Sequence, residues 1–241
     1  MNRPAILLLA PLAAALLTAA APAKRKAAPP PPRPPVALPM GDTVRVAIVT
    51  EMGTIEADLD HLRAPKTVEN FVRYVDGKRF DGMTFYRAMH LDWGDQPNGL
   101  IQGGWSGDPR KVLPPVIHEP TSLTGISHKA GALSMARFAP GTATSDFSIL
   151  LADLPQLDAD PKSADPDLQA GFSAFGHVVS GMDVVRRIWD APRSPTKGEG
   201  TPLKGQLLEP AVKVLSVRRV VLPAAAPLSP PAPVSPPPAA P

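Results

Sequence analysis

Proline is distributed very unevenly along the chain, and this limits which residues can fold. The chain has 33 prolines in 241 residues, and many fall in two tracts, APPPPRPPVALP at 28–39 and LPAAAPLSPPAPVSPPPAAP at 222–241. Such tracts favour extended polyproline II and cannot bury enough apolar surface to form a core. We therefore expect a disordered Pro-rich linker over 24–41, one folded domain over 42–221 and a disordered Pro/Ala-rich tail over 222–241. Recognition of the tracts by a partner is the alternative.

The first 23 residues have the outline of a secretory signal peptide. Arg3 precedes an apolar run, and small residues then give an Ala-x-Ala pattern just before Lys24. We expect cleavage near Ala21 or Ala23, export to the periplasm and no stable membrane insertion afterwards. The alternative is an uncleaved segment that anchors the protein in the membrane. The KRK sequence at 24–26 is unfavourable for both, because positive charge after an apolar run resists translocation.

The composition excludes several classes of function. The formal net charge is only +3 and the basic residues are scattered, which argues against a nucleic-acid partner. There are no cysteines, so disulfides, thiolate metal sites, cysteine nucleophiles and a lipoprotein anchor are excluded. The five histidines show no metal-ligand spacing. We therefore expect no metal and no cofactor, and nothing in the sequence requires more than a monomer.

Apolar residues within 43–221 recur with two different spacings, one typical of strands and one typical of helices. Apolar residues recur at every second position of TVRVAIVTEMGTIEADLD, on both sides of Gly53, which predicts two strands joined by a short turn. In APKTVENFVRYVDG they recur with helical spacing between Pro65 and Gly77, which predicts an amphipathic helix. A second short helix is predicted at 181–188 and a surface loop at 158–167. Many short strands with two helices indicate a closed barrel or a sandwich. Further strand-like runs lie at 83–88, 99–102, 131–136, 146–151, 172–179 and 211–221.

Seven segments follow one another along this region: TEMGTIEADL, APKTVENFVRYV, FYRAM, IQGG, HKAGALSMAR, SDFSI and FSAFGHVVSGMDVV. Their content and order resemble those of the cyclophilin-type peptidyl-prolyl isomerases, over nearly all of 43–221. The resemblance implies a mainly β fold, namely a closed eight-stranded antiparallel barrel capped by two α-helices. It also implies a shallow groove on the outer surface of the barrel, whose partners are proline-containing polypeptide substrates.

By residue-level match, the resemblance also implies which side chains form this groove. Arg87 in FYR matches the catalytic arginine, and Gln102 in IQGG matches a glutamine that binds substrate backbone beside it. A guanidinium stays charged at any working pH, so it is a suitable donor to the prolyl nitrogen. Such a donor competes for the lone pair whose delocalisation gives the peptide bond its rotation barrier of about 18–20 kcal/mol. The remaining matches are Leu100 at the proline site, Ala136 and Arg137 on a backbone ledge, and Leu168 and Phe172 on the far wall.

Three departures from the family pattern bear on activity. Ser148 in SDFSI replaces the phenylalanine that forms the floor of the proline pocket. Asp146 replaces a glutamine near the arginine, where a carboxylate would hold Arg87 through a charge-assisted hydrogen bond and offset part of its field. The connector HLDWGDQPNG is longer than usual, and Gly99 takes the place of an apolar residue. Trp93 in this connector either refills the pocket or is displayed on the loop tip.

Two functions follow from these matches and departures. The first is a peptidyl-prolyl cis–trans isomerase that assists the folding of exported proteins, with Arg87 polarising the prolyl nitrogen. The second is a catalytically weak cyclophilin-fold module or chaperone that binds peptides. Arg87 and Gln102 favour the first function, whereas Ser148, Asp146 and Gly99 favour the second.

Overall fold

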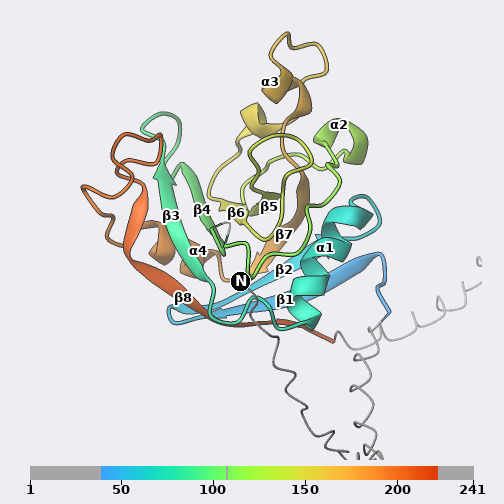
Figure 1. Cartoon of the computed structure of the whole chain (residues 1–241), viewed down its shortest axis with the longest axis horizontal. Helices are drawn as coiled ribbons and strands as arrows, with labels where there is room; N and C mark the ends of the chain where they lie inside the picture. The colour runs from blue at the N-terminus through green and yellow to red at the C-terminus, as the bar shows by residue number, and fades with distance from the viewer. Residues whose placement is uncertain (1–38, 107, 222–241) are drawn as a thin grey trace, which may run out of the picture. The chain divides into compact units, whose positions relative to one another are not determined.

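The computed structural model describes residues 39–106 and 108–221, all within a unit that spans residues 37–241. The predicted signal peptide over 1–23, most of the linker over 24–41 and the tail over 222–241 lie outside the described residues and stay predictions. In the described part, eight strands close into an antiparallel barrel in the order β1-β2-β7-β5-β6-β4-β3-β8 (Figure 1). The predicted fold class is therefore confirmed.

The strands lie close to the runs that the alternation of apolar residues predicts. β1 and β2 pair in register from Thr43 opposite Asp60 to Thr50 opposite Gly53, as expected for a tight hairpin. The long last strand closes the barrel by pairing with both β1 and β3. The strands are β1 (Thr43–Thr50), β2 (Gly53–Asp60), β3 (Thr84–His90), β4 (Gly99–Gly104), β5 (Ala132–Met135), β6 (Phe147–Leu150), β7 (Ala174–Ser180) and β8 (Leu207–Arg219).

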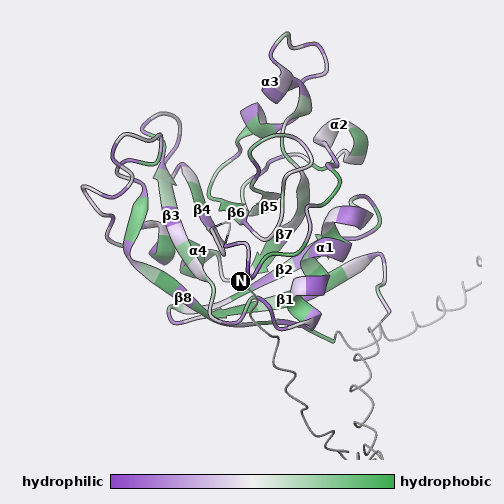
Figure 2. Cartoon of the chain, in the orientation of Figure 1, coloured by the Kyte–Doolittle hydropathy of each residue, from purple (hydrophilic) through white to green (hydrophobic). Residues whose placement is uncertain are grey.

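The two predicted helices pack against this barrel. Helix α1 (Pro65–Asp76) contacts β2 and β8, and helix α4 (Met182–Trp189) contacts β2, β3 and β4. Each buries an apolar stripe, and the hydrophilic residues on the outer face of α1 are visible in Figure 2. Gly53 has a φ of +130°, and a Cβ added there would lie 2.9 Å from a methyl group of Val184 in α4. The hairpin turn and the helix packing therefore both require glycine at this position.

Three short helical segments add to what the sequence predicts. They are α2 (Thr121–Thr124), the 3₁₀ segment η1 (Pro155–Leu157) and α3 (Pro166–Ala170). Helix α3 overlaps the stretch predicted as a surface loop, 158–167. The side chain of Asp165 caps α3 by accepting a hydrogen bond of 2.8 Å from the amide of Asp167. In Figure 1, α3 lies on a connection between β6 and β7 that projects away from the strands.

An aromatic cluster fills the barrel between α1 and β6. The ring of Phe71 in α1 lies 4.8 Å from that of Phe80, 5.2 Å from that of Phe147 and 5.4 Å from that of Phe175. All four side chains are almost fully buried, and burying each contributes about 1.5–3 kcal/mol. This packing fixes β6 from inside the barrel, so the residues of β6 that point outward stand on a rigid support.

Candidate active site

A pocket of about 430 Å³ lies over four neighbouring strands, β3, β4, β6 and β5. Four polar residues face one another across these strands: Arg87 pairs with Gln102, Gln102 with Ser148, and Ser148 with Ser134. We call these four residues the polar row. Their strand neighbours, such as Ile101, are buried in the barrel core. Because successive residues of a strand point to opposite faces, the polar row points outward, into the pocket.

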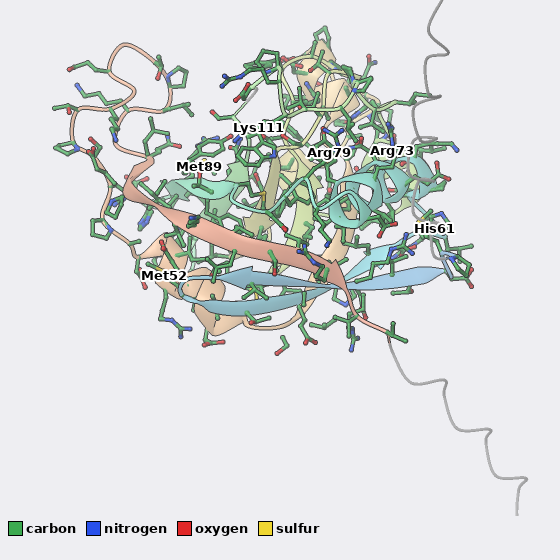
Figure 3. The ribbon with its side chains drawn as sticks, turned by 60° about the horizontal axis from the view of Figure 1, so that its bottom comes forward. Met52, His61, Arg73, Arg79, Met89 and Lys111 are labelled. Atoms are coloured by element: carbon green, nitrogen blue, oxygen red, sulfur yellow. The ribbon has the colours of Figure 1, made fainter. Side chains whose placement is uncertain are left out.

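The Arg87 side chain is held by two glutamines. Its Nε donates to Oε1 of Gln206 and its Nη1 donates to Oε1 of Gln102, both at 2.8 Å. Its Nη2 lies 3.5 Å from the sulfur of Met89, which is labelled on β3 in Figure 3. Burial lowers the pKa of Arg87, but a guanidinium remains protonated at neutral pH. The pocket therefore contains a fixed positive charge with N–H groups left over for a ligand.

Tyr86 fixes the orientation of Gln102. Nε2 of Gln102 donates to the Tyr86 hydroxyl at 2.7 Å, and this hydroxyl donates to Oδ2 of Asp146 at 2.9 Å. Burial, followed by the charge of Asp146, raises the pKa of Tyr86, so the phenol stays protonated and remains a donor to the carboxylate. Its oxygen must then accept from the Gln102 amide nitrogen, which turns the amide oxygen of Gln102 toward Arg87.

Asp146 does not make the predicted contact with Arg87. Its Oδ2 accepts from Tyr86, and its Oδ1 accepts from the backbone amides of Trp105 at 2.8 Å and Ser106 at 3.1 Å. The reason lies in the backbone, since Gly104 has a φ of +140° and a Cβ there would lie 2.1 Å from Oδ1 of Asp146. The last glycine of IQGG thus lets the carboxylate enter the turn after β4, where two amides compensate its charge.

The rest of the pocket is largely apolar. Leu100 and Phe172 line it as predicted, and so do Met135 and Leu157. Ser148 also lines it, so a hydroxyl stands where the family pattern has an aromatic ring. The pocket lining therefore combines thioether and aliphatic side chains with hydroxyl groups.

The far wall differs from the prediction at one residue. Leu168 is 49% exposed and lies outside the pocket, because the turn of α3 points it to solvent. Leu157, from η1, lines the pocket on this side instead. The side chain of Arg137 is only 3% exposed and ties the ledge to the wall: its Nη2 donates to the carbonyl of Gly171 at 2.7 Å, and its guanidinium lies 4.6 Å from the Phe172 ring centre. Ala136 lines the pocket as expected.

The long connector does not refill the pocket. Trp93 is 52% exposed and is not part of the pocket lining, so of the two alternatives it is the displayed position that the structure shows. Nδ2 of Asn98 donates to the carbonyl of Trp93 at 2.5 Å and holds the loop in place. Gly99 has a φ of +137°, and a Cβ there would lie 1.9 Å from the carbonyl oxygen of Met89. Backbone geometry therefore requires glycine at 99.

In all, the structure brings eight of the nine predicted site residues into one pocket: Arg87, Gln102, Leu100, Ala136, Arg137, Asp146, Ser148 and Phe172. Their roles toward a substrate stay predictions. Sequence reasoning missed Tyr86 and Gln206. Tyr86 directly precedes Arg87 in the FYR motif, so its position beside the catalytic candidate was a signal that could have identified it. No motif pointed to Gln206, which lies just before β8, far away along the chain.

No group of three or more histidine, aspartate or glutamate side chains in residues 39–106 and 108–221 is arranged to hold a metal ion. None of the helices in the same ranges combines the length and apolar character needed to cross a bilayer.

Comparison with known proteins agrees with this geometry. The model of the family described as "Cyclophilin type peptidyl-prolyl cis-trans isomerase/CLD" matches residues 45–217. A peptidyl-prolyl cis-trans isomerase of Acinetobacter baylyi is 35% identical over 153 residues, which cover 62% of this chain and 73% of that protein. One from Streptomyces antibioticus is 30% identical over 171 residues, which cover 69% of this chain and 96% of that protein.

Solved structures support the fold. A crystal structure of a cyclophilin-type peptidyl-prolyl cis-trans isomerase from Cryptosporidium parvum matches with a TM-score of 0.56 and 19% identity, covering 75% of this chain and 99% of that one. A second structure of the same protein, in the presence of the dipeptide Ala-Pro, matches with a TM-score of 0.55 and 18% identity. The barrel, the pocket around Arg87 and the match of the family model over residues 45–217 together show that this chain belongs to the cyclophilin-type peptidyl-prolyl cis-trans isomerases.

Proposed function

We propose that this chain catalyses cis–trans isomerisation of X-Pro bonds in extended polypeptide segments, with Arg87 donating a hydrogen bond to the prolyl nitrogen. The observation that carries the proposal is that hydrogen bonds hold the guanidinium of Arg87 in one orientation. Two glutamine oxygens at 2.8 Å, those of Gln102 and Gln206, fix the guanidinium over the pocket. The two terminal nitrogens carry four N–H groups in all, so donors remain beyond the bond to Gln102 and the weak contact with Met89.

The chemistry requires little beyond this donor. Rotation about the peptide bond localises the lone pair on the prolyl nitrogen, so the twisted transition state accepts a hydrogen bond better than the planar ground state. A preorganised donor aimed at developing electron density lowers a barrier by about 3–4 kcal/mol, or roughly two to three orders of magnitude in rate. Arg87 needs no reorganisation at the moment of rotation, because its partners already hold it.

Gln102 has a second role in this proposal. Its amide oxygen accepts from Arg87 and its amide nitrogen donates to Tyr86. One N–H and one oxygen lone pair of the amide therefore remain for the backbone of an extended substrate. The proline ring then occupies the apolar part of the pocket beside Leu100 and Met135. Substrate contacts by backbone and by one ring fit broad specificity for the residues around proline.

One observation favours a second candidate, a peptide-binding module or chaperone with little turnover. The pocket floor presents the hydroxyl groups of Ser134 and Ser148 in place of an apolar surface. A proline ring gains less free energy from contact with hydroxyls than from contact with an aromatic ring, since the transfer of apolar surface is worth about 25 cal/mol per Å². Weak binding of the ring would leave the donor at Arg87 poorly aligned with its target.

We further propose that the substrates are exported proteins and that the protein acts as a monomer in the periplasm, with a membrane-anchored form as the alternative. The support is the apolar run of residues 1–23 followed by small residues. The mass of the mature chain tests it: a start near Pro22 or Lys24 supports export with cleavage, and a full-length chain in the membrane fraction contradicts cleavage.

A rate measurement tests the isomerase proposal against the binding module. The wild-type chain should accelerate isomerisation of a short X-Pro peptide, and Arg87→Ala should lose most of that acceleration. Arg187→Ala is the matched control, because that arginine pairs with Asp183 at the surface and lies outside the pocket lining. Equal rates for wild type and Arg87→Ala at micromolar protein, with peptide still bound, would establish the binding module instead.

A further inference from the structure

Ser134, the last residue of the polar row, forms a linear hydrogen-bonded series with two side chains outside the row, those of His128 and Asp158. Nδ1 of His128 lies 2.6 Å from Oδ1 of Asp158, and Nε2 of His128 lies 2.8 Å from Oγ of Ser134. The imidazole is buried and Ser134 is 3% exposed. This is the order of groups, hydroxyl to imidazole to carboxylate, that activates a serine for attack on an acyl group. The isomerisation proposed above does not involve His128 or Asp158, and it involves Ser134 only as part of the pocket floor.

Neighbouring contacts fix the direction of these hydrogen bonds. Oδ1 of Asp158 also accepts from the backbone amide of His128 at 3.0 Å, so the carboxylate serves as the acceptor for Nδ1–H. Burial lowers the pKa of His128, so the ring is neutral and its Nε2 is free to accept. The hydroxyl hydrogen of Ser134 then points at Nε2, and the lone pairs of Oγ are left for another atom.

Ser134 is reachable from the pocket. It is part of the pocket lining, at the end of the polar row opposite Arg87. Directly across the strand pair stands Ser148, whose hydroxyl has no hydrogen-bond partner in the part of the chain that the structure describes. Residues paired in this way have Cα atoms roughly 4.5–5.5 Å apart, so the Ser148 hydroxyl can donate to an oxygen that develops on a group attached to Ser134.

We propose that Ser134 is a nucleophile, and that the pocket accepts small acyl esters in addition to proline-containing segments. Oγ of Ser134 attacks the acyl carbon while its proton passes to Nε2 of His128, and Ser148 donates to the oxyanion. The bond from the acyl carbon to the alcohol oxygen breaks, and the alcohol leaves with the proton from His128. Water then attacks the acyl–serine ester, gives its proton to His128, and releases the carboxylic acid as Oγ recovers that proton.

The shape of the pocket restricts the acyl group. The lining of the pocket that contains Ser134 includes the apolar residues Met135, Leu157 and Phe172, so a short aliphatic acyl chain fits the chemistry of the lining better than a charged one. The site lies within the same pocket as the proposed proline site, and an acyl group on Ser134 would therefore compete with a substrate proline ring.

Labelling with a short-chain alkyl fluorophosphonate tests this proposal on the full chain. Intact mass and peptide mapping should show one adduct, on Ser134, and Ser134→Ala should abolish it. The variant Asp158→Asn keeps an acceptor for Nδ1–H but removes the charge, a change that costs roughly ten-thousandfold in kcat in a serine protease. We expect it to slow labelling, and hydrolysis of p-nitrophenyl acetate, at least about tenfold. Asp153→Asn is the matched control, because that carboxylate pairs with Lys129 at the surface.

The labelling rates of the variants decide whether Ser134 is a nucleophile. Rapid labelling of wild type and of Asp153→Asn, with slow labelling of Asp158→Asn, supports the proposal. No adduct on Ser134, an adduct elsewhere only, or equal labelling rates in Asp158→Asn and wild type would overturn it. Circular dichroism and thermal unfolding show that the variants are folded. Arg87→Ala separates the two functions, since it should keep the Ser134 adduct while losing isomerisation.

Discussion

Replacing Tyr86 by phenylalanine tests whether the site is organised by the series Asp146–Tyr86–Gln102–Arg87. The substitution removes a single oxygen and keeps the ring. That oxygen donates to Asp146 at 2.9 Å and accepts from Gln102 at 2.7 Å. Without it, the Gln102 amide loses the contact that orients it, and its oxygen no longer has to face Arg87. We therefore expect lower activity with the fold retained.

The hydrogen bonds of Tyr86 set the expected losses of stability and of kcat/KM. A hydrogen bond to a charged group contributes about 1.5–3 kcal/mol, so Tyr86→Phe should lower the free energy of unfolding by about 2 kcal/mol. For a domain of this size, each kcal/mol corresponds to roughly 2–4 °C in Tm. Misorientation of Gln102 should lower kcat/KM for an X-Pro peptide by about tenfold, which is about 1.4 kcal/mol in the barrier.

Tyr74, the other tyrosine of the chain, provides the matched control. Its hydroxyl accepts a hydrogen bond of 2.6 Å from the amide of Leu113, and its buried ring lies outside the pocket lining. Tyr74→Phe should therefore cost stability and leave kcat/KM unchanged. Equal kcat/KM for Tyr86→Phe and wild type, or equal loss of kcat/KM in both variants, would refute the ordering role of Tyr86.

Three further predictions address the floor, the carboxylate and the phenol of this pocket. Ser148→Phe should raise kcat/KM several-fold if the hydroxyl floor limits binding of the proline ring; no gain in a folded variant would show that the floor is not limiting. Asp146→Asn should lower both Tm and kcat/KM, because Asp146 accepts from Tyr86 and two amides; a rise in kcat/KM would instead mean that its charge weakens Arg87. Because the pKa of Tyr86 is raised in the folded chain, its contribution to stability is complete below its ordinary pKa of about 10 and is lost as the pH rises above it. Urea unfolding of Tyr86→Phe above pH 10 should show a smaller loss, and an identical pH dependence in both proteins would count against the shifted pKa.

Local patterns were enough to predict the barrel strands and the two longer helices. Alternating apolar residues in β1 and β2 and helical spacing in α1 each report burial of one face, which the barrel core then imposes. Helix α3 escaped prediction because it has only five residues, buries none of them and depends on a local cap by Asp165. A short helix held by one cap and fully at the surface leaves no periodic apolar signal.

The candidate site was predictable where a motif holds the residue, and not where the fold brings distant residues together. Gln206 reaches Arg87 because β8 pairs with β3, and the strands that pair are far apart in sequence. Asp146 was expected to contact Arg87 because it replaces a glutamine that the family pattern has near the arginine. Its actual partners depend on the turn at Gly104, and side-chain direction inside such a turn cannot be derived from residue types alone.

The most direct test of the central claim separates transition-state stabilisation from substrate binding at Arg87. NMR exchange measurements on an X-Pro peptide give the isomerisation rate on the protein, and titration of the same peptide gives its affinity. For Arg87→Ala we expect the bound-state rate to fall by about a hundredfold or more while the affinity changes only a few-fold. An unchanged bound-state rate, with the whole effect in affinity, would contradict the role of the guanidinium as a donor to the twisted peptide bond.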